Sequence, residues 1–385
     1  LTWIQNYNFL QVYLNKIYLF MQQKSVLIAP LDWGLGHATR CIPIIAALQA
    51  LGYRVTIATD GPHEIILREA FPDLSFLTLK GYGIRYSKRA EGFAFKMLIQ
   101  IPRILYNILR EFWWLRKTNR HQAFDLIISD NRLGFFHLKT PSIFITHQLN
   151  LQTPFIWSTR LLQWMQYTWF RFFYTMVWVP DMEGDQNLSG ILGNPKHKPS
   201  VPVWYMNSLS RLKEYATGQT EVQKQEHLFL GIVSGPEPQR SIFQDILWQE
   251  GNKTNHPFQI IAGTANQPNN QAVSEHGSIV PHVGGPDLAK AIENATYIIS
   301  RGGYTSLMEL IPFNKKLILV PTPGQTEQEY LAKRWQEKGW AIAYDQTEFH
   351  LETALHKAAT FKYQPIPFKS FTKEALKETL KQVNL

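Results

Sequence analysis

The sequence predicts an α/β protein built from two doubly wound, Rossmann-like domains that face each other across a cleft. Apolar runs typical of strands alternate with runs typical of helices, and this alternation occurs twice along the chain. In each half, a glycine-rich turn follows a strand-like run and opens a helix. Such βαβ alternation is typical of a parallel sheet covered by helices on both faces. In this architecture, ligands bind at the carboxyl ends of the strands.

The first half begins with a buried-strand pattern at residues 25–30, which leads into a helix over 37–51 that Gly52 ends. A second strand at 54–59 is followed by a helix over 62–71. Two further apolar runs, at 125–129 and 142–146, predict additional strands of the same sheet.

The alternation then restarts in the second half. Strand-like runs occur at 228–233, 258–262, 297–300 and 316–320, and each of the last two leads into a helix. A stretch rich in Pro, Gly and Asn separates the halves and places the domain boundary near residue 200. We therefore expect a first domain over 21–200, a second over 201–364, and a C-terminal helix over 365–385 that packs back on the first. Residues 1–20 read as an extension outside the fold, with translation starting at Met21.

Composition limits the classes of partner. The net charge of +9 favours anionic partners such as phosphorylated substrates or acidic lipid. Nucleic acid is not expected, because the sequence has neither zinc-type Cys/His spacing nor an RNA-binding signature. A single cysteine, Cys41, forbids an internal disulfide and fits a cytoplasmic location. No run reaches about 18 apolar residues, so no transmembrane helix is predicted.

The segment 297–309 is the most informative motif. An apolar run ends in Ser300-Arg301-Gly302-Gly303, and Thr305 then opens a helix that carries Glu309 in its second turn. Backbone N–H groups and the positive end of a helix dipole suit a phosphate. Glu309 is placed to accept hydrogen bonds from sugar hydroxyls, so the segment reads as a nucleotide site. A buried turn followed by a surface glutamate is the competing interpretation.

The loop after the first strand, 31–40, admits three interpretations. Gly34 and Gly36 allow close approach of a ligand, and His37 stands at the helix N-terminus. His37 suits a general base, because its unperturbed pKa lies near neutrality. A dinucleotide fingerprint is the second interpretation, with Thr39 in place of the third glycine and Asp60 ending the next strand. The third is a histidine that only caps the helix.

Taken together, these motifs resemble those of the GT-B glycosyltransferases, and in particular the MurG-like bacterial transferases of glycosyltransferase family 28, which add N-acetylglucosamine to a lipid-linked precursor. The resemblance covers most of residues 25–365. Four places carry it, in this order along the chain: 34–37, 233–236, 282–283, and 301–309 with its continuation at 321–330.

The resemblance implies a set of donor-binding residues for a nucleotide sugar, expected to be UDP-linked. Glu309 matches the acid that binds the ribose, Val283 the residue whose backbone reads the base, and Gln328 and Glu329 the pair near the donor sugar. The matches in loops around the phosphates are Ser234, Gly235, Gly302, Gly303, Tyr304 and Thr305. Gly34 and Gly36 are ligand-binding candidates because they let the backbone approach a ligand closely.

For catalysis, the resemblance implies His37 as the base that deprotonates the acceptor hydroxyl. Asp130 and Asp32 are reserve bases, because each ends a strand near the cleft. We expect inversion at the anomeric carbon, no metal and no cofactor beyond the nucleotide sugar. The chain departs from the family at Gly302-Gly303, where relatives have Ser-Gly, and at 234–238. Residues 129–134 have no counterpart in it, which leaves the sugar and the acceptor open.

Two stretches suggest a lipid or cell-envelope glycan acceptor. Lys96, Arg103, Arg110 and Lys117 recur every seven residues and form one basic stripe on a helix with an apolar face from 98 to 115. Residues 155–179 are rich in aromatics and contain no acids. A basic helix with tryptophan can lie on an anionic membrane, so the protein is expected in the cytoplasm or peripherally on the inner membrane face. Helices packed into the first domain are the competing interpretation.

Three other functions remain as alternatives. A nucleotide-sugar epimerase of the same fold would need more carboxylates in the cleft. The NAD-dependent oxidoreductase follows from the dinucleotide interpretation of the loop at 31–40. A non-catalytic protein that binds nucleotide or lipid would share the same loops without the reaction.

Overall fold

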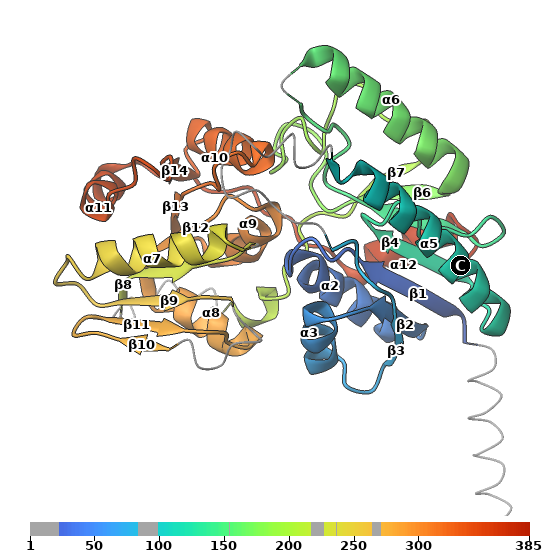
Figure 1. Cartoon of the computed structure of the whole chain (residues 1–385), viewed down its shortest axis with the longest axis horizontal. Helices are drawn as coiled ribbons and strands as arrows, with labels where there is room; N and C mark the ends of the chain where they lie inside the picture. The colour runs from blue at the N-terminus through green and yellow to red at the C-terminus, as the bar shows by residue number, and fades with distance from the viewer. Residues whose placement is uncertain (1–22, 84–98, 154, 217–226, 236, 264–270) are drawn as a thin grey trace, which may run out of the picture.

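The computed structural model describes residues 23–83, 99–153, 155–216, 227–235, 237–263 and 271–385. The expected extension at 1–20 and the positions Lys96, Leu98 and Pro236 lie outside the described residues. Within them the chain forms two α/β domains, each built on a seven-stranded sheet, confirming the predicted fold class (Figure 1).

The first sheet is entirely parallel and has the strand order β3-β2-β1-β4-β5-β6-β7. Its strands are β1 (Ser25–Pro30), β2 (Arg54–Thr59), β3 (Ser75–Thr78), β4 (Leu126–Asp130), β5 (Ser142–Ile145), β6 (Met176–Val179) and β7 (Val203–Tyr205). Because β1 pairs with both β2 and β4, the strand order reverses beside β1. The carboxyl end of β1 is therefore a topological switch point, where ligands bind in doubly wound folds.

Alternate residues of β1 enter two different cores. Val26 and Ile28 pack with α2 (Gly36–Ala50), whereas Leu27 and Ala29 pack against α5 (Ile101–His121). This two-sided burial explains why the strand reads as a continuous apolar run. The helices α3 (Pro62–Ala70) and α6 (Ile156–Phe173) complete the first domain.

The second sheet has the order β10-β11-β9-β8-β12-β13-β14, and it is parallel except for the β10–β11 pair. Its strands are β8 (His227–Ile232), β9 (Phe258–Ile261), β10 (Ala272–Val273), β11 (Gly277–Val280), β12 (Ala295–Ser300), β13 (Lys316–Leu319) and β14 (Ala341–Ala343). Its helices are α7 (Gln239–Gly251), α8 (Gly285–Glu293), α9 (Tyr304–Leu310), α10 (Thr326–Glu337) and α11 (Leu351–Thr360).

The two domains share a continuous hydrophobic core. Leu188 and Trp178 of the first domain belong to the same buried cluster as Tyr304 and Trp335 of the second. The last helix, α12 (Lys373–Lys381), contacts α2 and brings the C-terminus against the first domain, as Figure 1 shows. These contacts hold the carboxyl ends of the two sheets opposite each other.

The helices α5 and α6 are only partly packed into the first domain. In α6 only Phe170 is buried, whereas β6 is buried throughout. In α5 the buried face consists of Asn107, Glu111 and Leu115, and the apolar stripe expected to face the core is exposed at Ile101 and Leu105. Both stretches form helices, and the exposed apolar side chains fit a helix packed wholly into the first domain poorly.

Candidate active site

The first domain contributes a buried charge cluster at the switch point. His37 lies in the first turn of α2, and its Nδ1 is 2.9 Å from Oδ2 of Asp130, the last residue of β4. Because β1 and β4 are adjacent parallel strands, the loop after β1 and the end of β4 meet at the same edge of the sheet. The structure thus places two of the candidate catalytic residues in direct contact.

Arg40, one turn further along α2, completes this cluster. Its side chain is fully buried and holds both oxygens of Asp130, with Nε 3.1 Å from Oδ2 and Nη2 on Oδ1. Its Nη2 also lies 2.9 Å from Nδ1 of His37. No role was predicted for Arg40 from the sequence. It lies three residues after His37, however, and residues at this spacing are neighbours on one face of a helix.

The electrostatics of the cluster keep His37 neutral and Asp130 ionised. Burial, followed by the positive charge of Arg40, lowers the pKa of His37 to about 4, although Asp130 acts in the opposite direction. Burial raises the pKa of Asp130, but Arg40 and His37 outweigh it and bring that pKa to about 2. Near pH 7 the imidazole is therefore an unprotonated group held by a carboxylate, which is the state a general base requires.

Asp32 has a different environment. Its Oδ1 accepts a hydrogen bond from the backbone N–H of Tyr82 at 2.9 Å, and its Oδ2 accepts one from Gly83 at 3.1 Å. The carboxylate thus ties the β1 loop to the segment after β3. These contacts make Asp130 the carboxylate that orients His37, and leave Asp32 as the less suitable reserve base.

The glycine loop of the first domain is also fixed from α3. His63, nearly buried, places Nε2 2.9 Å from the backbone oxygen of Gly34. Gly34 has a φ of 128°, which favours glycine. The backbone of this loop is held in shape without using the His37 side chain.

In the second domain, the loop after β12 lies opposite this glycine loop. A Cβ added to Gly36 would lie 2.9 Å from Cβ of Thr305. Gly302 and Gly303 precede Thr305, and no side chain caps α9 at Gly303. Ser234, from the loop after β8, has its Oγ 3.5 Å from Oγ of Ser306. The two predicted phosphate-side loops of this domain therefore meet near the first-domain loop.

Tyr304 contributes its backbone to this loop, while its side chain joins the domains. The phenol is buried and donates a hydrogen bond to the backbone oxygen of Pro180 at 2.7 Å. Its ring stacks on His147 with centroids 4.4 Å apart and an interplanar angle of 8°. Only the main chain of Tyr304 is thus suited to a ligand.

Glu309 lies in α9 and forms an ion pair with Arg211. The Nε of Arg211 donates to Oε1 of Glu309 at 2.9 Å, and both side chains are mostly buried. His282 and Val283 follow β11 and precede α8, as the predicted base-binding segment requires. Burial lowers the pKa of His282, with Arg211 adding to that effect and Glu69 opposing it. The carboxylate predicted to bind the ribose is therefore paired with Arg211, whose charge also acts on His282.

The predicted sugar-side pair, Gln328 and Glu329, supports the loop before α10. Oε1 of Gln328 accepts from the backbone N–H of Thr322 at 2.9 Å, and Oε1 of Glu329 accepts from that of Gly324 at 2.7 Å. The side chain that reaches the first domain is Glu327, one residue earlier. It binds His147 Nε2 at 2.9 Å and also the amide of Gln148.

His147 and Glu327 were missed by sequence reasoning. The available signal was that His147 directly follows the strand predicted at 142–146, at the same edge of the sheet as Asp130. Glu327 could not be matched to it, because the two residues are 180 positions apart and lie in different domains.

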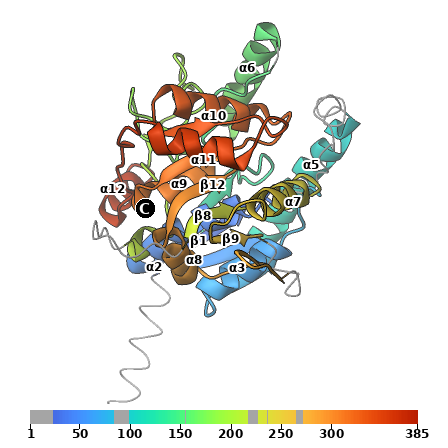
Figure 2. The ribbon, with the colours of Figure 1, turned by 90° about the vertical axis from the view of Figure 1, so that its left-hand side faces the viewer.

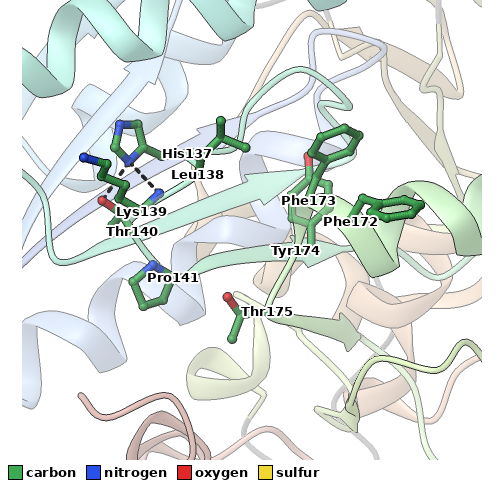
Figure 3. Close-up of a pocket in the computed structure, with 9 residues that line it drawn as sticks. All are labelled: His137, Leu138, Lys139, Thr140, Pro141, Phe172, Phe173, Tyr174 and Thr175. Carbon is green, nitrogen blue, oxygen red and sulfur yellow. Dashed lines mark hydrogen bonds between the residues drawn. The ribbon is translucent and has the colours of Figure 1, made fainter.

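A cavity of about 320 Å³ lies away from these residues (Figure 3). It lies at the amino ends of β5 and β6, between the 137–141 turn and the end of α6. Figure 3 shows His137 in this turn, where its Nδ1 accepts from the hydroxyl of Thr140 at 3.0 Å and from the backbone N–H of Lys139 at 3.4 Å. Across the described ranges, no three His, Cys, Asp or Glu side chains gather as a metal site.

Known proteins with a similar sequence or fold are glycosyltransferases. Residues 230–383 match the model of the glycosyltransferase family 28 C-terminal domain. Solved structures with the same fold include the glycosyltransferase SnogD of Streptomyces nogalater (15% identity, TM-score 0.59, 94% of this chain and 100% of that one). No curated protein sequence matches significantly.

Two further structures widen the comparison. One is MurG of Acinetobacter baumannii, with 16% identity, a TM-score of 0.50 and coverage of 88% of this chain and 90% of that one. The other is UGT2 of Phytolacca americana, complexed with UDP-2-fluoro-glucose and pterostilbene, with 12% identity, a TM-score of 0.55 and coverage of 94% and 100%. The fold is that of the GT-B enzymes. The match to the glycosyltransferase family 28 model is confined to residues 230–383, the second domain.

The match of the second domain also bears on the loop at 31–40. Residues 230–383 match a glycosyltransferase domain, which favours sugar transfer over the NAD-dependent interpretation of the loop at 31–40. Thr39, which replaces the third fingerprint glycine, instead donates through its hydroxyl to the backbone oxygen of Gly36 at 3.2 Å.

Proposed function

We propose that the protein transfers a sugar from a UDP-linked donor to an acceptor hydroxyl, with inversion at the anomeric carbon and His37 as the general base. One observation carries the proposal: the neutral His37, held by Asp130, stands on the loop that meets the Thr305 loop of the family 28 domain. This arrangement supports a base and a leaving-group site on facing loops of the two domains.

The reaction follows from that arrangement. Nε2 of His37 takes the proton of the acceptor hydroxyl while the acceptor oxygen forms a bond to the anomeric carbon. The bond from that carbon to the diphosphate oxygen breaks on the opposite face, and UDP leaves with the electron pair. Attack opposite the leaving group inverts the configuration. Asp130 stabilises the imidazolium that forms, as an ion pair at 2.9 Å.

Backbone N–H groups are the proposed partners of the diphosphate. The first turn of α9 offers those of residues 304 and 305, next to the hydroxyls of Ser234 and Ser306. Donors fixed before the reaction stabilise charge that develops on the leaving group. We propose that they serve without a divalent metal, and activity in the presence of EDTA is the test. Loss of activity that Mg²⁺ restores would reject this part.

The acceptor is proposed to be attached to a lipid, or to belong to a cell-envelope glycan. No described helix has the length and apolar character needed to cross a bilayer. Large apolar side chains are nevertheless exposed on α5 and α6, and both helices lie at the periphery in Figures 1 and 2. The most exposed on the two helices are Leu105, Tyr106, Leu109, Trp113, Ile156, Trp157, Trp164, Met165 and Phe172, and Ile99 and Phe155 just before the helices are exposed as well.

The charge of these helices supports the same partner. Each of the two carries arginines, and α6 contains no acid, whereas the acid of α5, Glu111, is buried. Exposed apolar groups rimmed by cations favour an anionic membrane surface. The middle of α6 is linked to the segment after β5, because Gln166 donates to the backbone oxygen of Gln148 at 2.9 Å. A lipid held at α6 would thus lie near the acceptor side of the cleft.

The catalytic proposal is tested with the His37→Ala and Asp130→Asn variants. A thermal-shift panel of nucleotides first identifies the donor base, with UDP expected to stabilise the protein and NAD not. Transfer, or slow hydrolysis of the stabilising nucleotide sugar, is then measured. His37→Ala is expected to lower turnover by about two to four orders of magnitude while UDP still binds. Unchanged turnover would remove His37 from this role, and epimerised product would reassign the reaction.

The membrane proposal is tested by flotation with vesicles containing phosphatidylglycerol. The double variant Trp157→Ser, Trp164→Ser is expected to lose flotation. Val273→Ser, which removes a highly exposed apolar group from the second domain, is the matched control and is expected to float normally. Wild-type protein that stays at the bottom at low salt would reject membrane docking.

A further inference from the structure

Arg40 connects the catalytic pair to the second domain. Its Nη1 lies 3.3 Å from Nδ1 of His147, and Nε2 of His147 lies 2.9 Å from Oε1 of Glu327. A continuous chain of polar contacts therefore runs from Asp130 and His37, through Arg40 and His147, to a carboxylate on α10. The inference below rests on the proposed role of His37.

The tautomer of His147 follows from donor and acceptor chemistry. A guanidinium only donates, so Nδ1 of His147 must accept from Arg40. The hydrogen of a neutral His147 is then on Nε2, where Glu327 accepts it. Although burial raises the pKa of Glu327, His147 and then Arg40 lower it, so the acceptor is a carboxylate. The ring cannot tilt freely, because Tyr304 stacks on its face.

Nδ1 of His37, unlike Nδ1 of His147, faces both a hydrogen-bond acceptor and a donor. Its Nδ1 has two neighbours at 2.9 Å: Oδ2 of Asp130, which accepts, and Nη2 of Arg40, which donates. If Nδ1 carries the hydrogen and donates it to Asp130, Nε2 has a free lone pair and can act as a base. If Nδ1 accepts from Arg40, the hydrogen is on Nε2 and the imidazole cannot take a proton there. The position of Arg40 therefore selects the tautomer of His37.

We propose that His147 is a positioning residue: held by Glu327 and Tyr304 of the second domain, it retains the Arg40 guanidinium so that the Nδ1 hydrogen of His37 goes to Asp130. Contact between the two domains thus sets the base-competent tautomer. Without His147, Nη1 of Arg40 loses an acceptor in a buried site, so the guanidinium is less firmly held on Asp130. Its Nη2, which is already 2.9 Å from Nδ1 of His37, then donates to that atom.

The side chains around Arg40 support this assignment. Its guanidinium is buried among Asp130, His37 and His147, and burial of a donor without an acceptor is costly. When the amide of Asn131 is oriented to satisfy its own neighbours, its oxygen lies 3.2 Å from Nη2 and gives that atom another acceptor. Nη1, by contrast, has His147 as its acceptor, so loss of His147 is expected to move Arg40 rather than leave Nη1 unpaired.

The structure offers a matched control on the same helix. Arg334, two turns after Glu327 on α10, donates to the backbone oxygen of Asn187 at 2.8 Å and also joins the domains. Within the part of the chain that the structure describes, its hydrogen bonds go to Asn187 and none goes to His37, Arg40 or Asp130. Removing it weakens the domain contact without touching the chain through Arg40.

The experiment compares His147→Ala, His147→Gln and Arg334→Ala with the wild type. Turnover and KM are measured, and the His37 tautomer is read by ¹⁵N NMR of histidine-labelled protein, with His37→Asn assigning the signal.

His147→Ala is expected to lower kcat by about 10-fold to 100-fold, part of the full general-base effect, with donor KM unchanged. The His37 signal is expected to move to the Nε2–H tautomer. His147→Gln, which can accept and donate, should recover part of kcat, and Arg334→Ala should keep the wild-type tautomer.

The outcomes separate this inference from the proposed function. Full activity in His37→Ala would reject the base itself and the inference with it. If His37→Ala is inactive but His147→Ala keeps the Nδ1–H tautomer and normal kcat, only the inference fails. The same tautomer shift in Arg334→Ala would also overturn it, because general loosening of the domains would then explain the effect.

Discussion

Gly36 of the first domain and Thr305 of the second meet where the two domains contact each other, and a methyl group on Gly36 would lie 2.9 Å from Cβ of Thr305. Real Cβ atoms do not approach so closely, and both neighbours belong to ordered helix starts, α2 and α9. The contact fixes how closely the loop bearing His37 can approach the loop proposed to hold the diphosphate.

Gly36→Ala is therefore expected to push the two loops apart. A displacement of this kind is expected to lower kcat/KM by about 10-fold to 100-fold, because misplacement of reacting groups by about 1 Å can cost two orders of magnitude. Thr305→Gly in the same chain removes the opposing Cβ and tests the steric cause, since stability and UDP binding can be measured for both. Full activity of Gly36→Ala would mean that these loops are not apposed in the working enzyme.

Much of the fold was readable from the sequence, because the central strands are buried on both faces and form uninterrupted apolar runs. The runs at 25–30 and 54–59 became β1 and β2 with the same bounds. The short outer strands β3, β7, β10 and β14 gave no such signal, having two to four residues each. Their position depends on partners far away in the chain.

The candidate site was only partly predictable, for the same reason. Asp130 and His37 could each be proposed from their position after a strand, but their contact depends on β1 lying beside β4. Residues 129–134, which match no family motif, supply Asp130 and also Arg132, whose guanidinium pairs with Glu111 of α5. Pairings such as His147 with Glu327 exist only once two domains are docked, and periodicity contains no information about docking.

Glu309 is predicted to bind the donor ribose, and its contact with Arg211 provides the test. Glu309→Gln is expected to weaken UDP binding by about 10-fold, since hydrogen bonds to a charged group contribute about 1.5–3 kcal/mol. Titration calorimetry with UDP measures this change. Arg211→Gln is the companion variant, because it breaks the ion pair while keeping the carboxylate.

The two variants distinguish a ligand-binding role from a purely structural one. A ribose contact predicts that Glu309→Gln lowers UDP affinity more than Arg211→Gln does. If both variants lower the melting temperature equally and neither changes UDP affinity, Glu309 is only the partner of Arg211.

Stability is expected to fall as pH decreases from 7 to 5. The pKa of His37 is about 4 in the folded protein, against 6.5 for an unperturbed histidine. The unfolded chain therefore binds more protons than the folded protein between these two pH values. The free energy of unfolding therefore rises with pH across this window and is lost on acidification. Burial also lowers the pKa values of His63 and His282, which act in the same direction.

Urea denaturation at pH 7 and pH 5 measures this effect. The free energy of unfolding of His37→Gln is expected to change less between the two pH values than that of the wild type, by about 2 kcal/mol. His350→Gln, at an exposed histidine, is the control and should follow the wild type. A slope unchanged by His37→Gln would contradict the lowered pKa.

The pair Glu111–Arg132 is predicted to be essential for stability rather than for chemistry. Both side chains are buried, and Tyr82 donates to Oε2 of Glu111 at 2.7 Å, so α5, the end of β4 and the segment after β3 meet at one carboxylate. Glu111→Ala would leave a buried guanidinium without its counter-charge, at a cost of about 3–5 kcal/mol. Glu64→Ala breaks the more exposed Glu64–Arg68 pair of α3 and is expected to cost at most about 0.5 kcal/mol. Equal unfolding midpoints in urea for the two variants would contradict the burial of the Glu111 pair, whereas a large gap confirms that α5 is locked to the sheet by charge as well as by Leu115.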